Sequence, residues 1–212
     1  MRSLLSTAKA GATATTQMIW LPGAYQSARD FLQAGFAEAV LDRHTPLDLT
    51  FIDLEMQHLA DRAALQRLRF DIVLPAIASG ASVWLAGISL GGSLALDYAS
   101  SYPDGLAGLF LVAPYLGNRM LIAEIAAAGG LAAWEPGELA ESDSDRRIWR
   151  HLKTGALSPS VFLGYGREDR FSPAHSLLAK ALPPDAIDVV DGGHEWRTWS
   201  KLWENFLDSR FK

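Results

Sequence analysis

The chain has 212 residues, of which 49% are hydrophobic and 20% are charged, and it contains no cysteine. This length and composition are typical of one globular domain with a sizeable core. The formal net charge of −5 comes without a block of basic residues, which argues against nucleic acid as the main partner. The absence of cysteine excludes disulfides, thiolate metal sites and cysteine nucleophiles, and is compatible with the cytoplasm, where we expect the protein.

We expect no secretory signal at the beginning of the given sequence. Residues Met1–Gln17 lack a sustained apolar core, since Lys9 interrupts them, so we expect a short disordered or loosely packed lead rather than a secretory signal. No apolar run in the chain approaches membrane-spanning length. The five histidines show no metal-ligand spacing, and we predict neither a metal nor another cofactor.

In chain order, short apolar runs alternate with longer stretches of helical periodicity. The expected strands are 18–21, 49–54, 83–86, 106–113, 161–164 and 187–190. The expected helices start at Ser27 (with Asp30 as its capping-box partner) and then cover about 59–77, the residues after Ser89, 118–128 with Asn118 as N-cap, 145–153, 172–182 with Ser172 as N-cap, and 195–211. This alternation predicts one α/β domain over residues 1–212, a three-layer sandwich around a mostly parallel six-stranded sheet.

The longest stretch without a strand pattern runs from Tyr115 to Leu157. It is too long for an ordinary connection, so we expect a lid or a helical insertion at the functional edge of the sheet. Its acidic part, Glu135–Asp145, is expected to form a solvated surface.

A buried strand, a sharp turn and a helix are predicted for Ser82–Leu96, and Gly87–Gly91 (Gly-Ile-Ser-Leu-Gly) fits Gly-x-Ser-x-Gly at the turn. A serine on a tight strand-to-helix turn has a strained backbone, and its neighbours two positions away must lack bulk. Ser89 would then lie at a helix N-terminus, where free N–H groups favour developing negative charge. The alternative is a glycine-rich turn with an idle serine.

A serine nucleophile needs a base, and the base needs an orienting carboxylate. In a parallel sheet these groups come from loops at the carboxyl ends of strands. Asp169 follows the strand at 161–164, and His194 follows the strand at 187–190. Each has a plainer interpretation: Asp169 as a surface carboxylate near a helix cap, with Glu168 as a competing acid, and His194 as a polar residue in the first turn of the last helix. The order Ser, Asp, His, each just after a strand, favours a catalytic triad.

An oxyanion hole needs two N–H donors aimed at the developing alkoxide. The N–H of Leu90, directly after the nucleophile, is one candidate. The second is expected from the loop Pro22–Tyr25, where Ala24 or Tyr25 would donate. The alternative for this loop is a simple Pro-Gly turn.

Together these motifs resemble the α/β-hydrolase superfamily from about Met18 to Phe211. Gly87–Gly91 looks like its nucleophile elbow, Gly166–Asp169 like its Gly-x-x-Asp acid loop, and Gly193-His194 like its histidine loop. Leu21–Ala24 is similar to its His-Gly-x oxyanion loop, with Pro22 where many members carry histidine. Two further strands usually begin the fold, and the residues before Gln17 offer no room for them, so a trimmed core is expected. Residues Tyr115 to Leu157 stand where the family places its cap.

The resemblance implies acyl transfer to water through a serine ester. We therefore expect a serine hydrolase, monomeric or homodimeric, acting on a small-molecule carboxylic ester with Ser89, His194 and Asp169 as triad. Aromatic residues suit apolar acyl chains, and the candidates for pocket walls, each with a core position as the alternative, are Tyr25, Tyr115, Trp134, Trp149 and Trp196. Rival functions are a thioesterase or acyltransferase with the same triad and a binding protein without turnover. A dienelactone-hydrolase-like enzyme would prefer a cysteine nucleophile, which the chain lacks.

Overall fold

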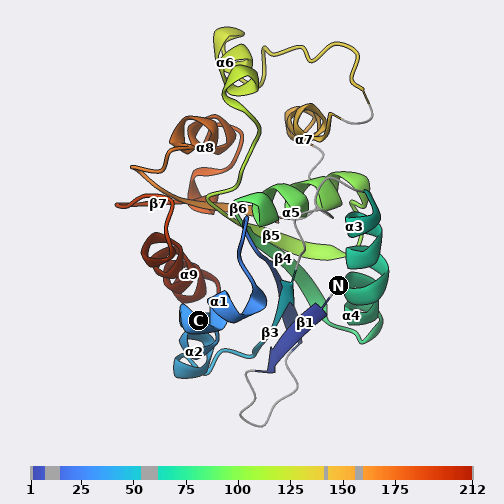
Figure 1. Ribbon diagram of the computed structural model, residues 1–212, viewed down its shortest axis with the longest axis vertical. Coiled ribbons are helices and arrows are strands. Elements are labelled where there is room, and N and C mark those ends of the chain that lie inside the picture. The colour runs from blue at the N-terminus through green and yellow to red at the C-terminus, as the bar shows by residue number, and fades with distance from the viewer. Residues whose placement is uncertain (1, 8–14, 54–61, 141–142, 156–159, 212) are drawn as a thin grey trace.

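The computed structural model describes residues 2–7, 15–53, 62–140, 143–155 and 160–211. Within these ranges a seven-stranded sheet has the strand order β1-β3-β2-β4-β5-β6-β7 (Figure 1). The strands are β1 (Arg2–Thr7), β2 (Thr16–Leu21), β3 (Leu47–Asp53), β4 (Ser82–Ile88), β5 (Leu106–Val112), β6 (Ser160–Gly166) and β7 (Ile187–Val190). The six predicted strands are β2 to β7, and they all run parallel. Leu54, the last residue of the second predicted strand, lies outside the described residues.

The seventh strand corrects the prediction for the start of the chain. β1 pairs antiparallel with β3 in a register from Arg2 opposite Asp53 to Thr7 opposite Asp48. Residues 2–7 are therefore not a loose lead. The strand pairs with the outer edge of β3, whose backbone N–H and C=O groups would otherwise face solvent unpaired. One strand, rather than the usual two, precedes β2 in the described chain.

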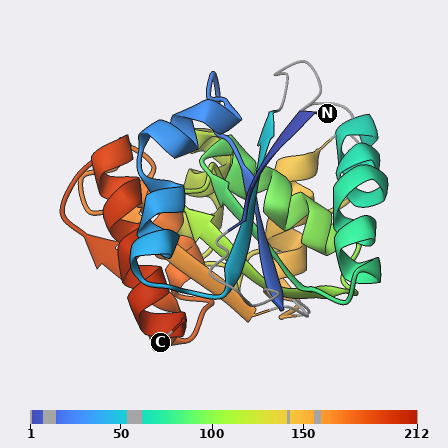
Figure 2. The ribbon, with the colours of Figure 1, turned by 90° about the horizontal axis from the view of Figure 1, so that it is seen from below.

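Helices cover both faces of the sheet. Figure 2 shows α9 with α1 and α2 on one side, and the helices from α3 to α5 on the other. The helical elements are α1 (Ala28–Gln33), α2 (Phe36–Asp42), α3 (Arg62–Arg67), the π-helical η2 (Leu68–Val73), α4 (Leu74–Ala78), α5 (Leu90–Ser101), α6 (Arg119–Ala127), α7 (Ser144–Lys153), α8 (Ser172–Ala179), the 3₁₀ segment η3 (Pro184–Ala186) and α9 (Trp196–Arg210).

Most predicted helix ends agree with the structure to within two residues. The Ser27–Asp30 capping box is confirmed, with the Ser27 N–H donating to Asp30 Oδ2 at 2.7 Å. The helix that begins there stops at Gln33, however, because Gly35 adopts a φ of 80° and starts a second helix. The predicted start of the next helix at Leu59 lies outside the described residues.

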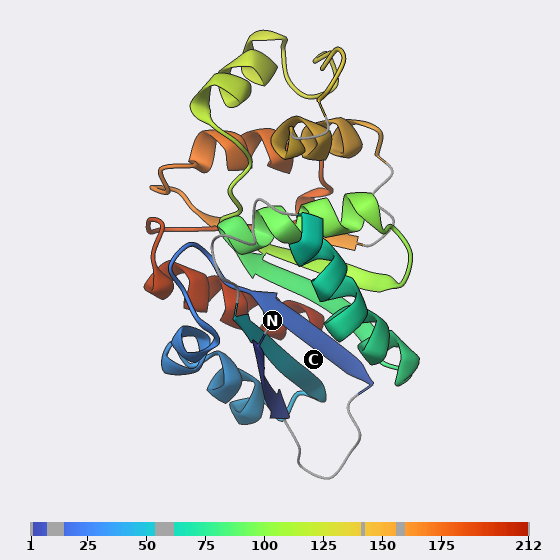
Figure 3. The same cartoon turned by 45° about the vertical axis from the view of Figure 1, so that its right-hand side comes forward.

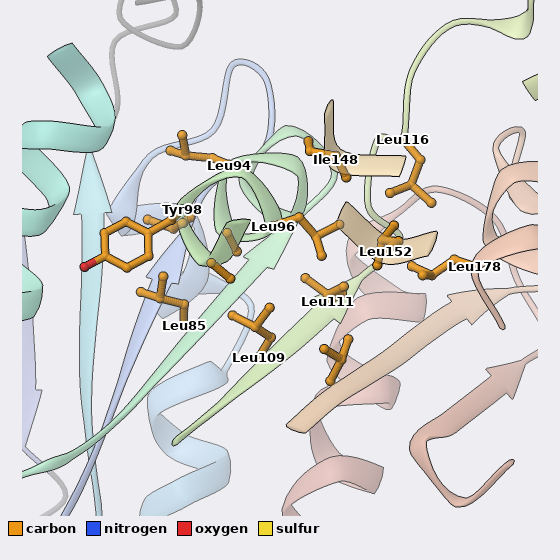
Figure 4. Close-up of a cluster of buried hydrophobic side chains, with 14 of the residues drawn as sticks. Leu85, Leu94, Leu96, Tyr98, Leu109, Leu111, Leu116, Ile148, Leu152 and Leu178 are labelled. Atoms are coloured by element: carbon orange, nitrogen blue, oxygen red, sulfur yellow. The ribbon is translucent and has the colours of Figure 1, made fainter. Parts of the chain in front are cut away.

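Two cores form on the two faces of the sheet. One is rich in aromatic rings: Trp20 of β2 makes edge contacts with Phe36 and Trp203, at ring-centroid distances of 4.9 and 5.1 Å. The other is mainly aliphatic, and Figure 4 shows Leu85, Leu109 and Leu111 of the sheet facing Leu96 and Tyr98 of α5, with Ile148 and Leu152 of α7 near Leu116. Burial of such side chains is the largest favourable contribution to the free energy of folding.

The stretch after β5 contributes to the aliphatic core. α6 and α7 lie beyond α5 and beside α8, on the same side of the sheet (Figures 1 and 3). The indole N–H of Trp149 donates to the carbonyl of Leu116 at 2.7 Å, which ties α7 to the segment leaving β5. The predicted N-cap Asn118 is confirmed, since its side-chain oxygen accepts from the Leu121 N–H at 3.0 Å.

Candidate active site

Ser89 stands alone between strand β4 and helix α5, with a φ of 52° and a ψ of −114°. A positive φ is strained for any residue with a side chain. A methyl group on Gly87 would overlap the backbone of Gly91, and one on Gly91 would overlap the carbonyl of Leu21. The turn therefore has the strained geometry expected of a nucleophile elbow, and both glycines are sterically required.

The segment leaving β5 holds the peptide groups of Ser89. The Ser89 N–H donates to the Val112 carbonyl at 3.0 Å, and the Ser89 carbonyl accepts from the Tyr115 N–H at 2.9 Å. Ser89 is 8% exposed, and its Oγ makes no hydrogen bond with another described residue. The backbone at this position is thus fixed, while the hydroxyl has no competing partner in the described chain.

Asp169 and His194 come together from two different loops. Asp169 follows β6 and is 2% exposed, and its Oδ2 lies 2.7 Å from Nδ1 of His194, which follows β7. Its Oδ1 accepts from the Phe171 N–H at 2.8 Å. Burial alone would raise the pKa of Asp169, but the hydrogen bonds from His194 and Phe171 outweigh burial and keep the pKa below its ordinary value. A carboxylate acceptor at Nδ1 leaves Nε2 as the ring nitrogen able to take a proton.

The competing acid, Glu168, has a different partner. Its Oε2 accepts from the Gly192 N–H at 2.5 Å, at an exposed position. The prediction of Ser172 as the N-cap of the following helix is wrong, because Ser172 is the first helical residue and Phe171 is the N-cap. Pro173 fits the first turn, where no N–H is needed. The Asp169 carboxylate, by holding the Phe171 N–H, fixes this helix start.

Ser89 and His194 lie at the same edge of the sheet, because both follow parallel strands at their carboxyl ends. The described residues contain no hydrogen bond between them. The ring of Phe171 contacts both the His194 ring and the Tyr115 ring, at centroid distances of 5.2 and 5.7 Å.

The loop that was predicted to complete an oxyanion hole lies against the elbow, since Gly91 faces the carbonyls of Leu21 and Pro22. The Gly23 N–H donates to Gln26 Oε1 at 2.7 Å, so it is already used. In the described chain, the N–H groups of Leu90 and Ala24 have no hydrogen-bond acceptor. Tyr25 has a φ of 60° and is 93% exposed, so its ring extends into solvent.

Of the five aromatic residues predicted as pocket walls, Tyr115 lines a described cavity. Trp134 and Trp149 are buried, and their indole N–H groups donate to Glu124 and to the Leu116 carbonyl. Trp196 is half-buried and packs against Phe31 at 5.4 Å. Trp134 and Trp149 therefore take the core positions that were their alternative interpretation, whereas Trp196 packs at the border of the aromatic core and stays a prediction as a pocket wall.

A cavity of about 120 Å³ has Leu90, the residue after Ser89, among its lining residues. Sequence patterns do not predict it, because its walls come from separate segments. They are Leu90, Ser93, Leu94 and Asp97 of α5, Tyr115, and Ser144, Asp145 and Ile148 of α7. Burial, together with the charges of Asp143 and Asp97, raises the pKa of Asp145, so this end of the acidic run is not simply a solvated surface. Asp97 is 3.5 Å from Arg147.

A larger hollow, of about 530 Å³, lies at the other end of α5. It is lined by residues such as Ser101, Arg147 and His151, and by none of the predicted site residues. Within the described ranges, no three histidine, aspartate or glutamate side chains gather as a metal site would require. No described helix combines the length and apolar character that crossing a membrane requires.

Comparison with solved structures identifies the fold, whereas comparison of the sequence finds no match. No protein-family model and no curated protein matches the chain. Among solved structures, FphF, a fluorophosphonate-binding serine hydrolase of Staphylococcus aureus, is 12% identical over 94% of this chain and 84% of its own, with a TM-score of 0.65. Est1E from Butyrivibrio proteoclasticus is 15% identical over 99% and 94%, with a TM-score of 0.67. The monoacylglycerol lipase of Paleococcus ferrophilus is 15% identical over 97% and 99%, with a TM-score of 0.60. The chain has the α/β-hydrolase fold.

Proposed function

We propose that this α/β-hydrolase-fold protein is a serine hydrolase that cleaves small or medium carboxylic esters through an acyl-enzyme on Ser89. The observation that carries the proposal is the 2.7 Å contact between the Asp169 carboxylate and His194, at the sheet edge where Ser89 occupies a strained turn. A buried aspartate that holds the Nδ1 proton leaves Nε2 as a base, which is what a serine nucleophile requires.

In the proposed first step, Ser89 Oγ attacks the ester carbonyl while His194 Nε2 takes the hydroxyl proton. The Asp169 carboxylate keeps the proton on Nδ1 and stabilises the imidazolium that forms. The N–H groups of Leu90 and Ala24 stabilise the developing oxyanion. His194 then gives its proton to the leaving alkoxide, and the alcohol departs. Water, activated by His194, hydrolyses the acyl-enzyme to release the acid and restore Ser89.

The substrate would enter beside α7, in the insertion covering residues 115–157, which we propose acts as a helical cap. Tyr115 supports this placement, because its N–H holds the Ser89 carbonyl and its residue lines the same cavity as Leu90. A volume of about 120 Å³ suits a short acyl or alcohol group rather than a long lipid chain. Ester-cleaving names among the structural neighbours, such as ferulic acid esterase and monoacylglycerol lipase, agree with a carboxylic ester as substrate and do not bear on its chain length.

The test is hydrolysis of p-nitrophenyl acetate, butyrate and octanoate, with acetyl-CoA as the thioester comparison. Ser89→Ala should lower kcat/KM for the short esters by at least about 10³-fold. Ser100→Ala is the matched control, because this serine lies at the far end of the same helix and donates to the Asp97 carbonyl at 2.9 Å. A wild-type rate that Ser89→Ala leaves unchanged would contradict the proposal, and a strong preference for acetyl-CoA would favour the thioesterase alternative.

A further inference from the structure

A second histidine, His175 of α8, lies close to the Asp169–His194 pair, and no sequence pattern singles it out. Its exposure is 0%, and its Nε2 lies 2.9 Å from the carbonyl oxygen of Pro114. Because a carbonyl oxygen only accepts, Nε2 carries the proton and donates. Nδ1 is buried and has no hydrogen-bond partner in the described chain. Buried polar groups are normally hydrogen-bonded, and satisfied bonds of this kind rigidify the segments that they join.

On one side, this bond reaches the segment that holds the nucleophile. Pro114 lies between Val112, which accepts the Ser89 N–H, and Tyr115, whose N–H donates to the Ser89 carbonyl. The side chain of Pro114 also packs where a Cβ on Gly92 would collide with it. The Pro114 carbonyl and the Tyr115 N–H belong to the same peptide group, so a shift of this carbonyl would move the N–H that holds the Ser89 carbonyl.

On the other side, His175 belongs to the segment that holds the acid. Its backbone N–H donates to the Phe171 carbonyl at 3.2 Å, and the Phe171 N–H donates to Asp169 Oδ1 at 2.8 Å. Asp169 in turn contacts His194. The bond from His175 to Pro114 thus joins the Ser89 segment to the Asp169–His194 segment, beyond the point where β5 and β6 are paired in the sheet.

The neutral form of His175 suits this position. Burial lowers its pKa to about 4, so the ring carries no charge near neutral pH. The titratable groups that face it are Asp169, His194 and Tyr165, whose ring centroid is 5.0 Å away. A charged imidazole here would attract the Asp169 carboxylate, which His194 needs as its own partner.

We infer that His175 is a positioning residue, which sets the separation of Ser89 from His194 by tying the Pro114 carbonyl to α8. This inference rests on the proposed hydrolase function. A misplacement of about 1 Å between reacting groups can cost about 10²-fold in rate. Loss of the bond should therefore lower kcat and leave KM nearly unchanged, since His175 is buried and cannot touch the substrate.

The experiment compares His175→Gln, which retains a side-chain N–H donor, with His175→Met, which has similar bulk and no donor. Leu178→Ala is the control, because Leu178 is also fully buried on α8 and its truncation destabilises without removing the hydrogen bond between His175 and Pro114. With p-nitrophenyl acetate, His175→Met should lower kcat by about tenfold or more with KM within about twofold, and His175→Gln should stay within about threefold of wild type. Wild-type kcat in His175→Met, no rescue by glutamine, or an equal loss in Leu178→Ala would overturn the inference.

A second measurement does not depend on turnover. In ¹⁵N-histidine-labelled protein, NMR should show His175 as the neutral tautomer protonated at Nε2, down to about one unit below the ordinary histidine pKa of about 6.5. The resonances of His194 should shift in His175→Met and stay in place in Leu178→Ala. The opposite tautomer, or unshifted His194 resonances, would overturn the inference. If Ser89→Ala leaves wild-type hydrolysis unchanged, the proposed function fails, and the NMR result still decides whether His175 holds Pro114.

Discussion

Replacing Asp169 with asparagine changes one atom of a fully buried side chain and reverses its role toward His194. Asparagine Oδ1 can still accept from the Phe171 N–H, as Asp169 Oδ1 does at 2.8 Å. The amide nitrogen, which only donates, then faces His194 Nδ1. The imidazole must move its proton to Nε2, where it can no longer accept the proton of Ser89. The fold should be preserved, because size and the Phe171 bond are unchanged.

The expected loss follows from the charge that is removed. Two unit charges roughly 4 Å apart interact by about 4 kcal/mol at an effective dielectric constant of about 20, which corresponds to about 10³-fold in rate. The wrong tautomer adds to this loss, and the same exchange in Ser-His-Asp proteases lowers kcat by about 10⁴-fold. We therefore expect kcat of Asp169→Asn to fall by about 10³- to 10⁴-fold.

The assay is initial-rate hydrolysis of p-nitrophenyl acetate near neutral pH, with circular dichroism to check folding. Glu168→Gln is the matched control, because Glu168 is the neighbouring carboxylate and bonds the Gly192 N–H instead of His194. Glu168→Gln should keep its rate within about threefold of wild type. The reasoning is refuted if Asp169→Asn remains within about tenfold of wild type, or if Glu168→Gln loses as much as Asp169→Asn.

Three further changes probe the elbow, the cavity and the buried histidine. Gly91→Ala places a methyl group against the Leu21 carbonyl, so it should abolish activity and lower the melting temperature. Gly193→Ala should fold normally, because the nearest atom to its added methyl group is 3.9 Å away. Equal melting temperatures of the two variants would contradict the steric reasoning. Asp145→Asn removes a charge from the cavity that Leu90 and Tyr115 line. The ratio of kcat/KM for a p-nitrophenyl ester of a dicarboxylic acid to kcat/KM for the neutral ester should rise by about fivefold, because repulsion from a charge roughly 8 Å away costs about 1 kcal/mol at a dielectric constant of about 40. An unchanged ratio would argue that the substrate does not enter this cavity. His175 has a pKa of about 4 in the folded chain, which lies below its value in the unfolded chain. Between these two pKa values the unfolded chain binds a proton at this residue and the folded chain does not. The free energy of unfolding should therefore fall by about 3 kcal/mol as the pH drops from about 6.5 to about 4. Urea unfolding should show this slope in wild type and not in His175→Gln, whereas the contribution of Asp169, whose pKa is lowered, is lost below that window.

Local chemistry fixes the geometric features of the candidate site that the sequence predicts and the structure contains. Gly87 and Gly91 are required by the backbone contacts around Ser89, so the spacing of the glycines predicts the turn directly. Asp169 and His194 each follow an apolar strand. Because parallel strands end at one edge of the sheet, residues that directly follow them are expected to lie close together. The 2.7 Å distance between Asp169 Oδ2 and His194 Nδ1 agrees with this expectation.

Elements whose bounds depend on a distant strand, or on a backbone conformation that residue type alone does not fix, were predicted less well. β1 is a strand because the edge of β3 is available to it, and nothing within six residues reveals that edge. The helix from Ser27 breaks at Gly35, where a left-handed φ of 80° ends α1 and begins α2. Ser172 has a typical capping side chain, but Asp169 holds the Phe171 N–H and starts the helix one residue earlier than a Ser172 cap would.

Features assembled from several segments were outside the reach of sequence patterns. The cavity beside Leu90 combines α5, α7 and Tyr115, and the role of His175 becomes visible only through its contact with Pro114. Composition also cannot separate a tryptophan in a pocket wall from one in the core. Trp149 is buried because its indole N–H reaches the Leu116 carbonyl, a bond between residues distant in sequence.

The most direct measurement is reaction with a fluorophosphonate probe, followed by mass spectrometry to locate the adduct. An activated serine attacks the phosphorus, whereas an idle serine at the same exposure does not. We predict a single adduct on Ser89 in the wild-type protein and none in His194→Ala, because Nε2 of His194 is the base that takes the Ser89 proton. Folded wild-type protein that acquires no adduct, or one that His194→Ala acquires equally fast, would contradict the assignment of Ser89 and His194 as nucleophile and base.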